Sequence, residues 1–376
     1  MTVNQIYALI NTINADSIKG EINVVDASSF VNFGNLVLTS SENKEKFYNT
    51  LVDRIGKTVF AIREYEKKNR NVTVDAFTFG SILQKISYKL QNAENNSTWD
   101  NAPLNPYTLE PKGGVVQKLF ATELGTWAYT DVILDSQLNS AFVNEMAFAG
   151  FVNGLYIRMR NSLEVAKENT DNVAIASLVA EVFNEVKTAT KNTRRARNLL
   201  AEYKALHPDI TITEETCWES DKFLEFCCVE MGTVIPFMGR MTSMYNNGEV
   251  ERVTKPDDLI VEVNSVFEKK YDVYLKANTF HDSMVSLPNY ESVAYWLFPT
   301  DPMLIKIGPN ENPVEIKNVI AIFRDKDAVV DTFENERTVS MYDSINERTY
   351  VKASCNRRFI ADTSENVVFF YVADAV

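Results

Sequence analysis

The sequence contains very little histidine and cysteine. Two histidines occur among 376 residues, without a His-x-x-x-His spacing, so no histidine-based metal site is predicted. The four cysteines include a vicinal pair but no Cys-x-x-Cys, which argues against a zinc site or a disulfide scaffold. Since free cysteine is usually buried, we expect four reduced, partly buried thiols: Cys217, Cys227, Cys228 and Cys355.

The glycine-rich and nucleophile motifs of common enzymes are also missing. No Gly-x-Gly-x-x-Gly follows a predicted strand, and neither Gly-x4-Gly-Lys-Ser/Thr nor Gly-x-Ser-x-Gly occurs. The pair Gly113-Gly114 lies in a proline-bounded loop without a clear following helix, so a turn is favoured over a phosphate-binding loop.

The remaining candidates for chemistry favour structural roles. His281 could act as a general base oriented by Asp282, but the side chains of adjacent residues rarely point toward one another. Three carboxylate pairs could bind a divalent cation or take part in acid–base catalysis, yet solvated turns explain them better: Asp257-Asp258, Glu214-Glu215 and Asp325-x-Asp327. The sequence therefore predicts no catalytic, cofactor-binding or metal-ligating residue, and no enzyme.

Positive charge is scarce relative to negative charge. Acidic residues number 51 against 38 basic ones, a net charge of −13, which disfavours nonspecific binding to nucleic acid or anionic lipid. One basic cluster stands out, and we expect it to meet acidic surface on this molecule or on a neighbouring copy; phosphate contact is the alternative. Its members are Lys187, Lys191, Arg194, Arg195, Arg197 and Lys204.

Long apolar runs are absent as well. No stretch approaches the roughly 18 apolar residues of a membrane helix. The first residues lack the basic segment of a secretory signal, and asparagines interrupt their apolar run. We therefore expect a soluble protein that is intracellular when made.

The first third of the chain alternates regular and irregular segments. Apolar residues at steps of three and four predict an amphipathic helix over residues 1–15. Residues 16–44 are mixed in character and read as an extended arm, with a helix from about residue 42 to 52 and a strand over 57–63. The next stretch, to about residue 125, lacks strong periodicity, which is typical of a long functional loop.

The strongest periodic signal in the sequence follows. Apolar residues at a mean spacing close to 3.6 predict a long helix over residues 137–168, on a face formed by Leu138, Phe142, Met146, Ala149, Val152, Tyr156, Met159 and Leu163. Gly150 and Gly154 fall inside it, which indicates close packing or a bend. Further helices are expected over 175–186 and 192–206, the latter ended by Pro208.

Beyond Pro208 the pattern becomes mixed and then rich in strands. Strands are predicted over 210–212 and 259–263, with helical turns over 267–275. After residue 300 the predicted strands are 303–307, 316–323, 338–342, 350–353 and 367–372. Because 376 residues exceed one compact core, we expect an α+β chain with two or three lobes.

Four segments, taken in order, carry a family resemblance. They are residues 50–57 (TLVDRIGK); residues 138–165, from LNSAFV through NSLEV; residues 257–263 (DDLIVEV) with 271–277 (YDVYLKA); and, more weakly, 322–328 (IFRDKDA). In these segments the chain resembles the major capsid proteins of tailed phages with the Hong Kong 97 type of fold, nearest to those of small picovirus-type podophages.

The resemblance implies a domain organisation. It places an N-arm over 1–48, the entry to the peripheral (P) domain over 49–64, an E-loop that reaches over an adjacent subunit over 65–125, and the P domain with its long spine helix over 126–208. An axial (A) domain would follow over 209–300, and residues 301–376 would form strands that return to the P domain.

The resemblance also implies a function. The chain would self-assemble into pentamers and hexamers of an icosahedral head shell around double-stranded DNA, without a cofactor. Its partners would be other copies of itself, a scaffolding protein during assembly, a portal protein, and packaged DNA bound to the inner face without sequence specificity; no membrane is involved. Synthesis would occur in the cytoplasm of a host bacterium, and the final location would be the virion capsid.

Two alternatives remain open at this point. A protein-compartment shell of the encapsulin type would share the fold but close around a cargo enzyme without a scaffold. A soluble carboxylate-based, metal-dependent enzyme would instead use the acidic pairs described above, and tight stoichiometric binding of a divalent cation would favour it.

Overall fold

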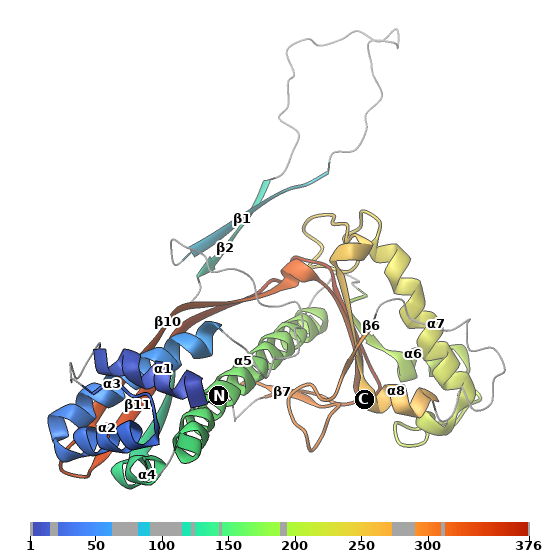
Figure 1. Cartoon of the computed structure of the whole chain (residues 1–376). Helices are drawn as coiled ribbons and strands as arrows, with labels where there is room; N and C mark the ends of the chain where they lie inside the picture. Colours follow the sequence, from blue (N-terminus) through green and yellow to red (C-terminus); the bar gives the residue numbers. More distant parts are fainter. Residues whose placement is uncertain are drawn as a thin grey trace, which may run out of the picture.

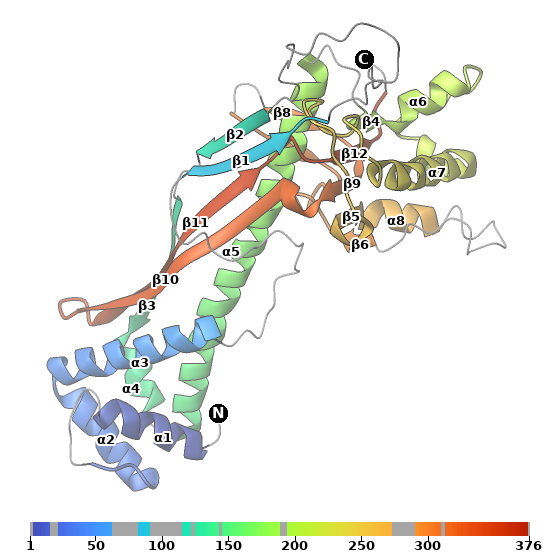
Figure 2. The ribbon, with the colours of Figure 1, turned by 90° about the horizontal axis from the view of Figure 1, so that it is seen from above.

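The structure is a computed structural model that describes residues 3–15, 22–61, 82–90, 115–121, 125–142, 145–188, 194–272, 290–309 and 313–374. It has two lobes connected by a long helix and a long sheet that run side by side (Figures 1 and 2). The N-terminal helices form a helical lobe at one end, and a five-stranded sheet with its covering helices forms an α/β lobe at the other.

The helical lobe begins with three consecutive helices, α1 (Val3–Ile13), α2 (Ala27–Thr39) and α3 (Ser41–Ala61). The first of these confirms the predicted amphipathic helix. The predicted arm is wrong over α2, which begins with a capping box: Ser29 N donates to Asp26 Oδ1 at 2.7 Å, and Asp26 N donates to Ser29 Oγ at 3.0 Å. The strand predicted over 57–63 is also wrong up to residue 61, because α3 continues to that point.

An aromatic core holds these helices together. The ring of Phe142 lies 5.8 Å from that of Phe30, 5.6 Å from that of Phe47 and 5.2 Å from that of Phe148, measured between centroids. A Cβ atom added to Gly34 would lie 2.9 Å from Phe142 Cδ1, so glycine is needed where α2 meets this ring. The core of the helical lobe therefore centres on Phe142.

The long helix α5 (Glu145–Thr188) has 44 residues and is about 66 Å long at the usual rise. It confirms a helix over most of 137–168 and merges with the one predicted over 175–186. A separate short helix, α4 (Asp135–Ala141), precedes it, so the predicted start at residue 137 is wrong. Of the predicted apolar face, Phe142 and Leu163 are buried, but Met146 is 79% exposed.

Close packing does not explain the glycines of α5. A Cβ atom at Gly150 or Gly154 would meet no heavy atom within 4 Å, so neither position needs glycine for a close approach. Five other side chains predicted for the buried face lie outside the described part of the structure: Leu138, Ala149, Val152, Tyr156 and Met159.

A three-stranded antiparallel sheet runs beside α5 between the lobes. Its order is β10 (Val329–Asp343), β11 (Arg348–Ala361), β3 (Gly125–Leu134), and it is called the long sheet below. Alternate residues on its inner face, such as Ile133 and Val351, are buried in the core of the helical lobe. The opposite face of the sheet is left without a covering element among the described residues.

The α/β lobe is built on a five-stranded sheet. The strand order is β4 (Ala196–Asn198), β12 (Val367–Tyr371), β9 (Val319–Asp325), β5 (Leu259–Asn264), β6 (Tyr290–Val293). Neighbouring residues of β12 serve different cores: Val368 and Phe370 face helix α7, whereas Val367 and Phe369 face α5. Residues 301–376 are thus divided, since β9 and β12 belong to this sheet and β10 and β11 to the long sheet.

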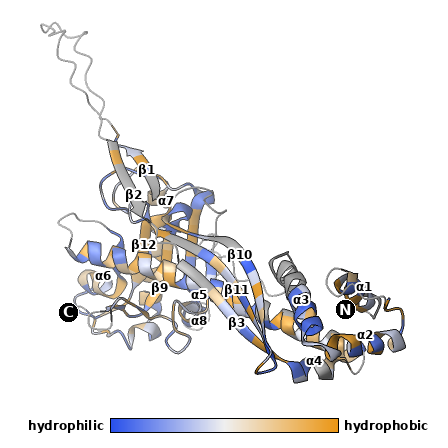
Figure 3. Cartoon of the chain, turned by 90° about the vertical axis from the view of Figure 1, so that its left-hand side faces the viewer, coloured by the Kyte–Doolittle hydropathy of each residue, from blue (hydrophilic) through white to orange (hydrophobic). Residues whose placement is uncertain are grey.

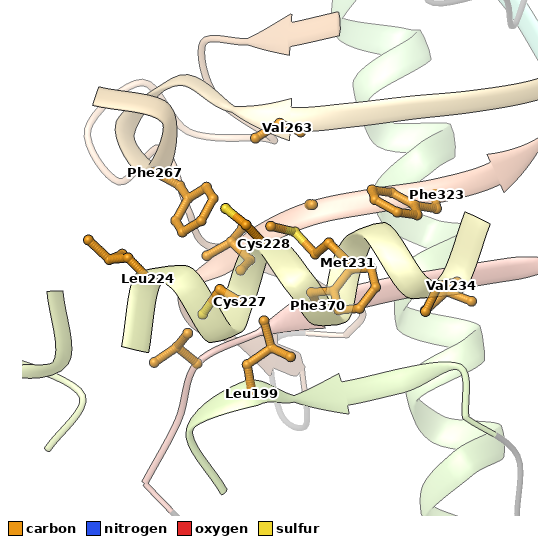
Figure 4. Close-up of a cluster of buried hydrophobic side chains, with 14 of the residues drawn as sticks. Leu199, Leu224, Cys227, Cys228, Met231, Val234, Val263, Phe267, Phe323 and Phe370 are labelled. Atoms are coloured by element: carbon orange, nitrogen blue, oxygen red, sulfur yellow. The ribbon is translucent and has the colours of Figure 1, made fainter. Parts of the chain in front are cut away.

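Three helices cover the face of the sheet opposite α5: α6 (Leu199–Leu206), α7 (Asp221–Met238) and α8 (Ser265–Tyr271). Figure 4 shows Leu224, Cys227, Cys228 and Met231 of α7 in one buried cluster with Phe267, Phe323 and Phe370. The sequence analysis missed α7. The helix predicted over 192–206 is wrong before residue 199, because β4 occupies 196–198 as an edge strand beside β12.

The strand predicted over 210–212 is also absent, since these residues form a loop without strand pairing. The strands predicted over 259–263, 303–307, 338–342, 350–353 and 367–372 are confirmed, with shifted ends. The single strand predicted over 316–323 is wrong at residues 317 and 318, which lie between the strands Val314–Ile316 and Val319–Asp325. The helical turns predicted over 267–275 are confirmed as far as 271. Smaller elements include a pair of strands, β7 (Ile305–Ile307) with β8 (Val314–Ile316), and short 3₁₀ turns at Cys217–Glu219, Pro256–Asp258 and Lys326–Ala328.

Polar residues separate the cores along α5. Between Leu163, in the core of the helical lobe, and Ala174, in the core beneath the five-stranded sheet, the buried residues of α5 are polar or charged. We call this stretch the polar waist: Glu164, Lys167, Thr170, Asp171 and Asn172. The apolar Val165 and Val173 in the same stretch are exposed, so the usual distribution is reversed there.

The four thiols are free and buried, as predicted. Burial raises the pKa of Cys217 and of Cys228 to about 12, so only about one thiol in ten thousand is a thiolate at pH 8. We expect no fast reaction of the folded chain with Ellman's reagent at pH 8, and four reacting thiols in 6 M guanidinium chloride. Fast modification of a thiol in the folded chain would contradict this burial.

Candidate assembly surfaces

At least two of the three acidic pairs considered for chemistry have a member in a structural contact. Asp258 forms an ion pair with Lys326 at 2.6 Å, and Asp325 Oδ2 accepts a hydrogen bond from Thr254 Oγ1 at 2.7 Å. Across the described part of the chain, no three His, Cys, Asp or Glu side chains form a group that could hold a metal ion. His281 and the Gly113-Gly114 pair lie outside the described residues.

Three members of the basic cluster form ion pairs within the molecule, in line with one of the roles expected for the cluster. Arg195 pairs with Glu185 at 2.7 Å, Arg197 with Glu230 at 2.6 Å, and Lys204 with Asp374 at 2.6 Å. Arg197 also pairs with Glu202, and these carboxylates hold the pKa of its guanidinium above the ordinary value in spite of burial. The cluster fastens α5, β4 and α6 to one another and to the end of β12; Lys191 lies outside the described residues.

A hairpin projects from the body of the molecule (Figures 1 and 3). Its strands, β1 (Ile82–Tyr88) and β2 (Val115–Ala121), are antiparallel and form a sheet of two strands. Alternate residues of β1 and the two positions after it point to solvent: Ile86 is 49% exposed, Tyr88 72% and Leu90 58%. We call these three residues the outer row.

The other face of β1 contacts the body through polar groups. Lys85 Nζ lies 2.7 Å from Asp362 Oδ2, and Ser87 Oγ accepts a hydrogen bond from Arg252 Nη2 at 2.7 Å. Leu90 N also donates to Glu251 Oε2 at 3.5 Å. Strand β1 thus turns polar side chains inward and apolar side chains outward, the reverse of a strand that covers its own core.

The long sheet has a second exposed apolar surface. Met341, Tyr350 and Val132 lie side by side across its three strands, and Met341 is 64% exposed. Val339 and Leu134 lie on the same face and are also exposed. Since monomeric proteins seldom leave such apolar surface uncovered, the outer row and this sheet face are the candidate surfaces for contact with another protein.

A polar cluster fixes the end of the long sheet against the helical lobe. Asp135, at the start of α4, pairs with Lys44 of α3 at 3.1 Å and accepts a hydrogen bond from the Tyr342 hydroxyl at 2.9 Å. Burial and the Asp135 carboxylate raise the pKa of Tyr342 to about 12 and also raise the pKa of Tyr48. The cluster joins α3, α4 and β10, so it supports the sheet rather than forming an open site.

The surfaces were only partly predictable from the sequence. The alternation at residues 86–90 was visible, and the irregular stretch around it was interpreted as a functional loop. The exposed face of the long sheet is not predicted, because the strands predicted over 338–342 and 350–353 are not assigned a buried and an exposed side. Alternating apolar residues such as Val339 and Met341 are the signal that could have revealed it.

Comparison with known proteins gives a consistent result. A sequence profile of the family described as Phi29-like phage major capsid protein matches residues 8–371. The chain is similar to one in the capsid structure of Staphylococcus phage Andhra, with a TM-score of 0.53, 9% identity, and coverage of 83% of this chain and 86% of that one. It is also similar to a chain in a structure of native bacteriophage P68 that describes its head fiber and inner core protein gp22, with a TM-score of 0.53, 11% identity, and coverage of 82% and 86%. No curated protein sequence matches.

These similarities confirm the mixed helix-and-sheet capsid fold of the Hong Kong 97 type that the resemblance implied. Neither alternative, the compartment shell or the carboxylate-based metal-dependent enzyme, is supported by them. In the described part of the chain, no helix has the length and apolar character needed to span a membrane.

Proposed function

Since the chain belongs to the family of Phi29-like phage major capsid proteins, we propose that its copies form the icosahedral head shell of a tailed phage around double-stranded DNA. The observation that carries the proposal is the family match over nearly the whole chain, together with the apolar surfaces that a single copy leaves exposed. The copies would be arranged as pentamers and hexamers. The protein would be structural and without enzymatic activity, made in the cytoplasm of the host bacterium and located in the virion capsid.

The domains would be distributed over the observed elements as follows. The N-arm (1–48) comprises α1, α2 and the start of α3, and residues 49–64 lead into the P domain. The E-loop (65–125) contains the β1–β2 hairpin, and the P domain (126–208) contains α5 as the spine helix. The A domain (209–300) supplies α7 and β5, and residues 301–376 complete both sheets.

The hairpin would be the arm that reaches over an adjacent copy. Its outer row is apolar and uncovered, whereas its inner face is already bound to its own subunit. Burying a large apolar side chain stabilises a contact by about 1.5–3 kcal/mol, so the row is suited to hold a neighbour. A scaffolding protein, a portal protein and DNA bound without sequence specificity would be the other partners.

Negative-stain electron microscopy tests the proposed function. The chain is produced together with the scaffolding protein encoded by the same phage, and closed shells are expected. A protein that stays monomeric under every condition would contradict the proposal. Shells that form without scaffold around a cargo enzyme would instead support a compartment.

Changing the outer row should separate assembly from folding. In Ile86→Ser/Tyr88→Ser, each contact between copies loses about 3 kcal/mol or more, a factor of a hundred or more in its association constant. We expect the monomer to keep its unfolding midpoint while shell yield collapses in sedimentation. Lys89→Ser, at an exposed position of the same segment, is the control; equal yields from both variants would mean that the row is not buried between copies.

A further inference from the structure

The β1–β2 hairpin depends on side chains to keep its orientation. Its strands pair with each other and, within the described residues, with no other strand. An isolated two-stranded hairpin is only marginally stable in water, so the angle at which it leaves the body depends on its contacts with the body. These contacts include the side chains of Lys85 and Ser87, and Leu90 N, which donates to Glu251 Oε2 at 3.5 Å. The angle is therefore set by the contacts that its inward face makes.

Those contacts enter a site that is organised without the hairpin. The turn between β11 and β12 is held by Asp362, whose Oδ1 accepts hydrogen bonds from Ser364 N at 2.9 Å and from Ser364 Oγ at 2.6 Å. Arg252 Nε donates to Ser364 O at 2.8 Å, and Arg252 N donates to Thr242 O at 3.0 Å. The groups on the body that bind the hairpin, Asp362 and Arg252, are thus held in place by contacts within the body itself.

Two cations and two carboxylates meet at this point. Lys85 of the hairpin pairs with Asp362 at 2.7 Å and also with Glu365, while Arg252 Nη1 lies 3.1 Å from Glu365 Oε1. The carboxylate side chains are 2% and 9% exposed, so these are not surface ion pairs. We call these four residues the latch. Removing Lys85 would leave two buried carboxylates facing a single arginine.

We propose that Lys85 and Arg252 are positioning residues for assembly, which latch the hairpin to its own subunit and so aim the outer row at a neighbouring copy. This inference rests on the proposed function. Lys85 fixes one end of the inward face to the turn between β11 and β12, and Arg252 fixes the next inward residue, Ser87. With both contacts in place, Ile86 and Tyr88 have to point away from the body.

The distance between two spin labels measures the orientation directly. Nitroxides are attached at Tyr88→Cys on the hairpin and Val229→Cys on α7, both at exposed positions, while the four native thiols are buried and stay unlabelled. Pulsed electron resonance on the dilute full chain should give one narrow distance distribution. In Lys85→Met we expect the width to rise at least about twofold, because an unlatched hairpin samples many orientations.

Controls separate positioning from general stability. Lys85→Arg should restore the narrow distribution, and Lys89→Met, at an exposed position close by, should leave it unchanged. Circular dichroism should show the same secondary structure as in the unsubstituted chain. If Lys85→Met does not fold, Glu365→Gln keeps the side-chain size, removes one charge and is expected to broaden the distribution in the same way.

The outcomes distinguish this inference from the function on which it rests. An unchanged width in Lys85→Met overturns the latch, whatever the shells do. A broadened width together with an unchanged yield of shells overturns its role in assembly, whereas a broadened width with a lower yield supports it. Failure of the unsubstituted chain to form shells with its scaffold overturns the proposed function and leaves the distance result intact.

Discussion

Replacing Phe142 with alanine is expected to lower the free energy of unfolding by about 3–5 kcal/mol, enough to make most of the protein insoluble on expression. The ring is 5% exposed and lies within 5.8 Å of the rings of Phe30, Phe47 and Phe148, between centroids. These residues come from α2, α3 and α5, so the cavity left by the ring would open where three helices meet. Partial collapse cannot fill it, because each helix is also held by the other two.

Urea unfolding followed by circular dichroism measures this loss. Met146→Ala is the matched control: Met146 lies only four residues further along the chain but is 79% exposed, so its removal should change the free energy by less than about 0.5 kcal/mol. A soluble Phe142→Ala protein with the unfolding midpoint of the unsubstituted chain would show that the aromatic cluster is not the core of the helical lobe.

The second large effect is expected from Arg324→Met. Arg324 on β9 and Glu262 on β5 have fully buried side chains, with Nη2 and Oε1 3.5 Å apart, in the middle of the five-stranded sheet. Removing the guanidinium leaves the carboxylate buried without its positive partner, which costs about 3–5 kcal/mol in comparable pairs. We expect the midpoint of urea unfolding to fall accordingly.

The double variant Arg324→Met/Glu262→Met decides the cause of that loss. A methionine pair of similar size carries no charge, so most of the lost stability should return. If the double variant is as unstable as Arg324→Met alone, the loss comes from altered packing between β5 and β9 and not from an unpaired charge. With the single variant Glu262→Met added, the three measurements give the coupling between the residues.

The elements predicted best from the sequence are those in which local pattern and final environment agree. The strand over 259–263 is apolar at nearly every position because it is buried on both faces of its sheet, and β5 confirms it. The segment over 57–61 shows the opposite case. Its β-branched residues favour a strand, yet helix α3 continues through it, so weak local preference does not decide the structure of this segment.

Helix α7 shows how a residue can be interpreted for the wrong property. The sequence analysis examines Cys227 and Cys228 for metal binding and disulfide formation. In the structure they occupy core positions beside Leu224 and Met231, with the spacing of one helix face. Read as small apolar side chains, they would have predicted the helix. Met146 shows the opposite error, since it is predicted to be buried and is exposed. An apolar residue with the spacing of a buried face need not be covered near the end of a helix.

The candidate site was less predictable than the fold. The outer row follows from three alternating residues, two on β1 and one just after it, but Lys85 and Asp362 are 277 positions apart in sequence. Nothing local to either residue indicates the other, and only the return of the chain after β11 brings them together. The polar residues on the inward face of the hairpin can therefore be seen in the sequence, whereas the site on the body that they contact cannot.

The polar waist of α5 has a consequence for how the chain loses its order. Cooperative unfolding requires that the apolar contacts of one region depend on those of the next, and along α5 that continuity is interrupted from Glu164 to Asn172. Each lobe has apolar core residues of its own, so one lobe can unfold while the other stays folded, as in proteins whose parts unfold as separate units. A single melting temperature then describes one lobe rather than the whole chain. Removing the ring of Phe142 would leave the α/β lobe folded.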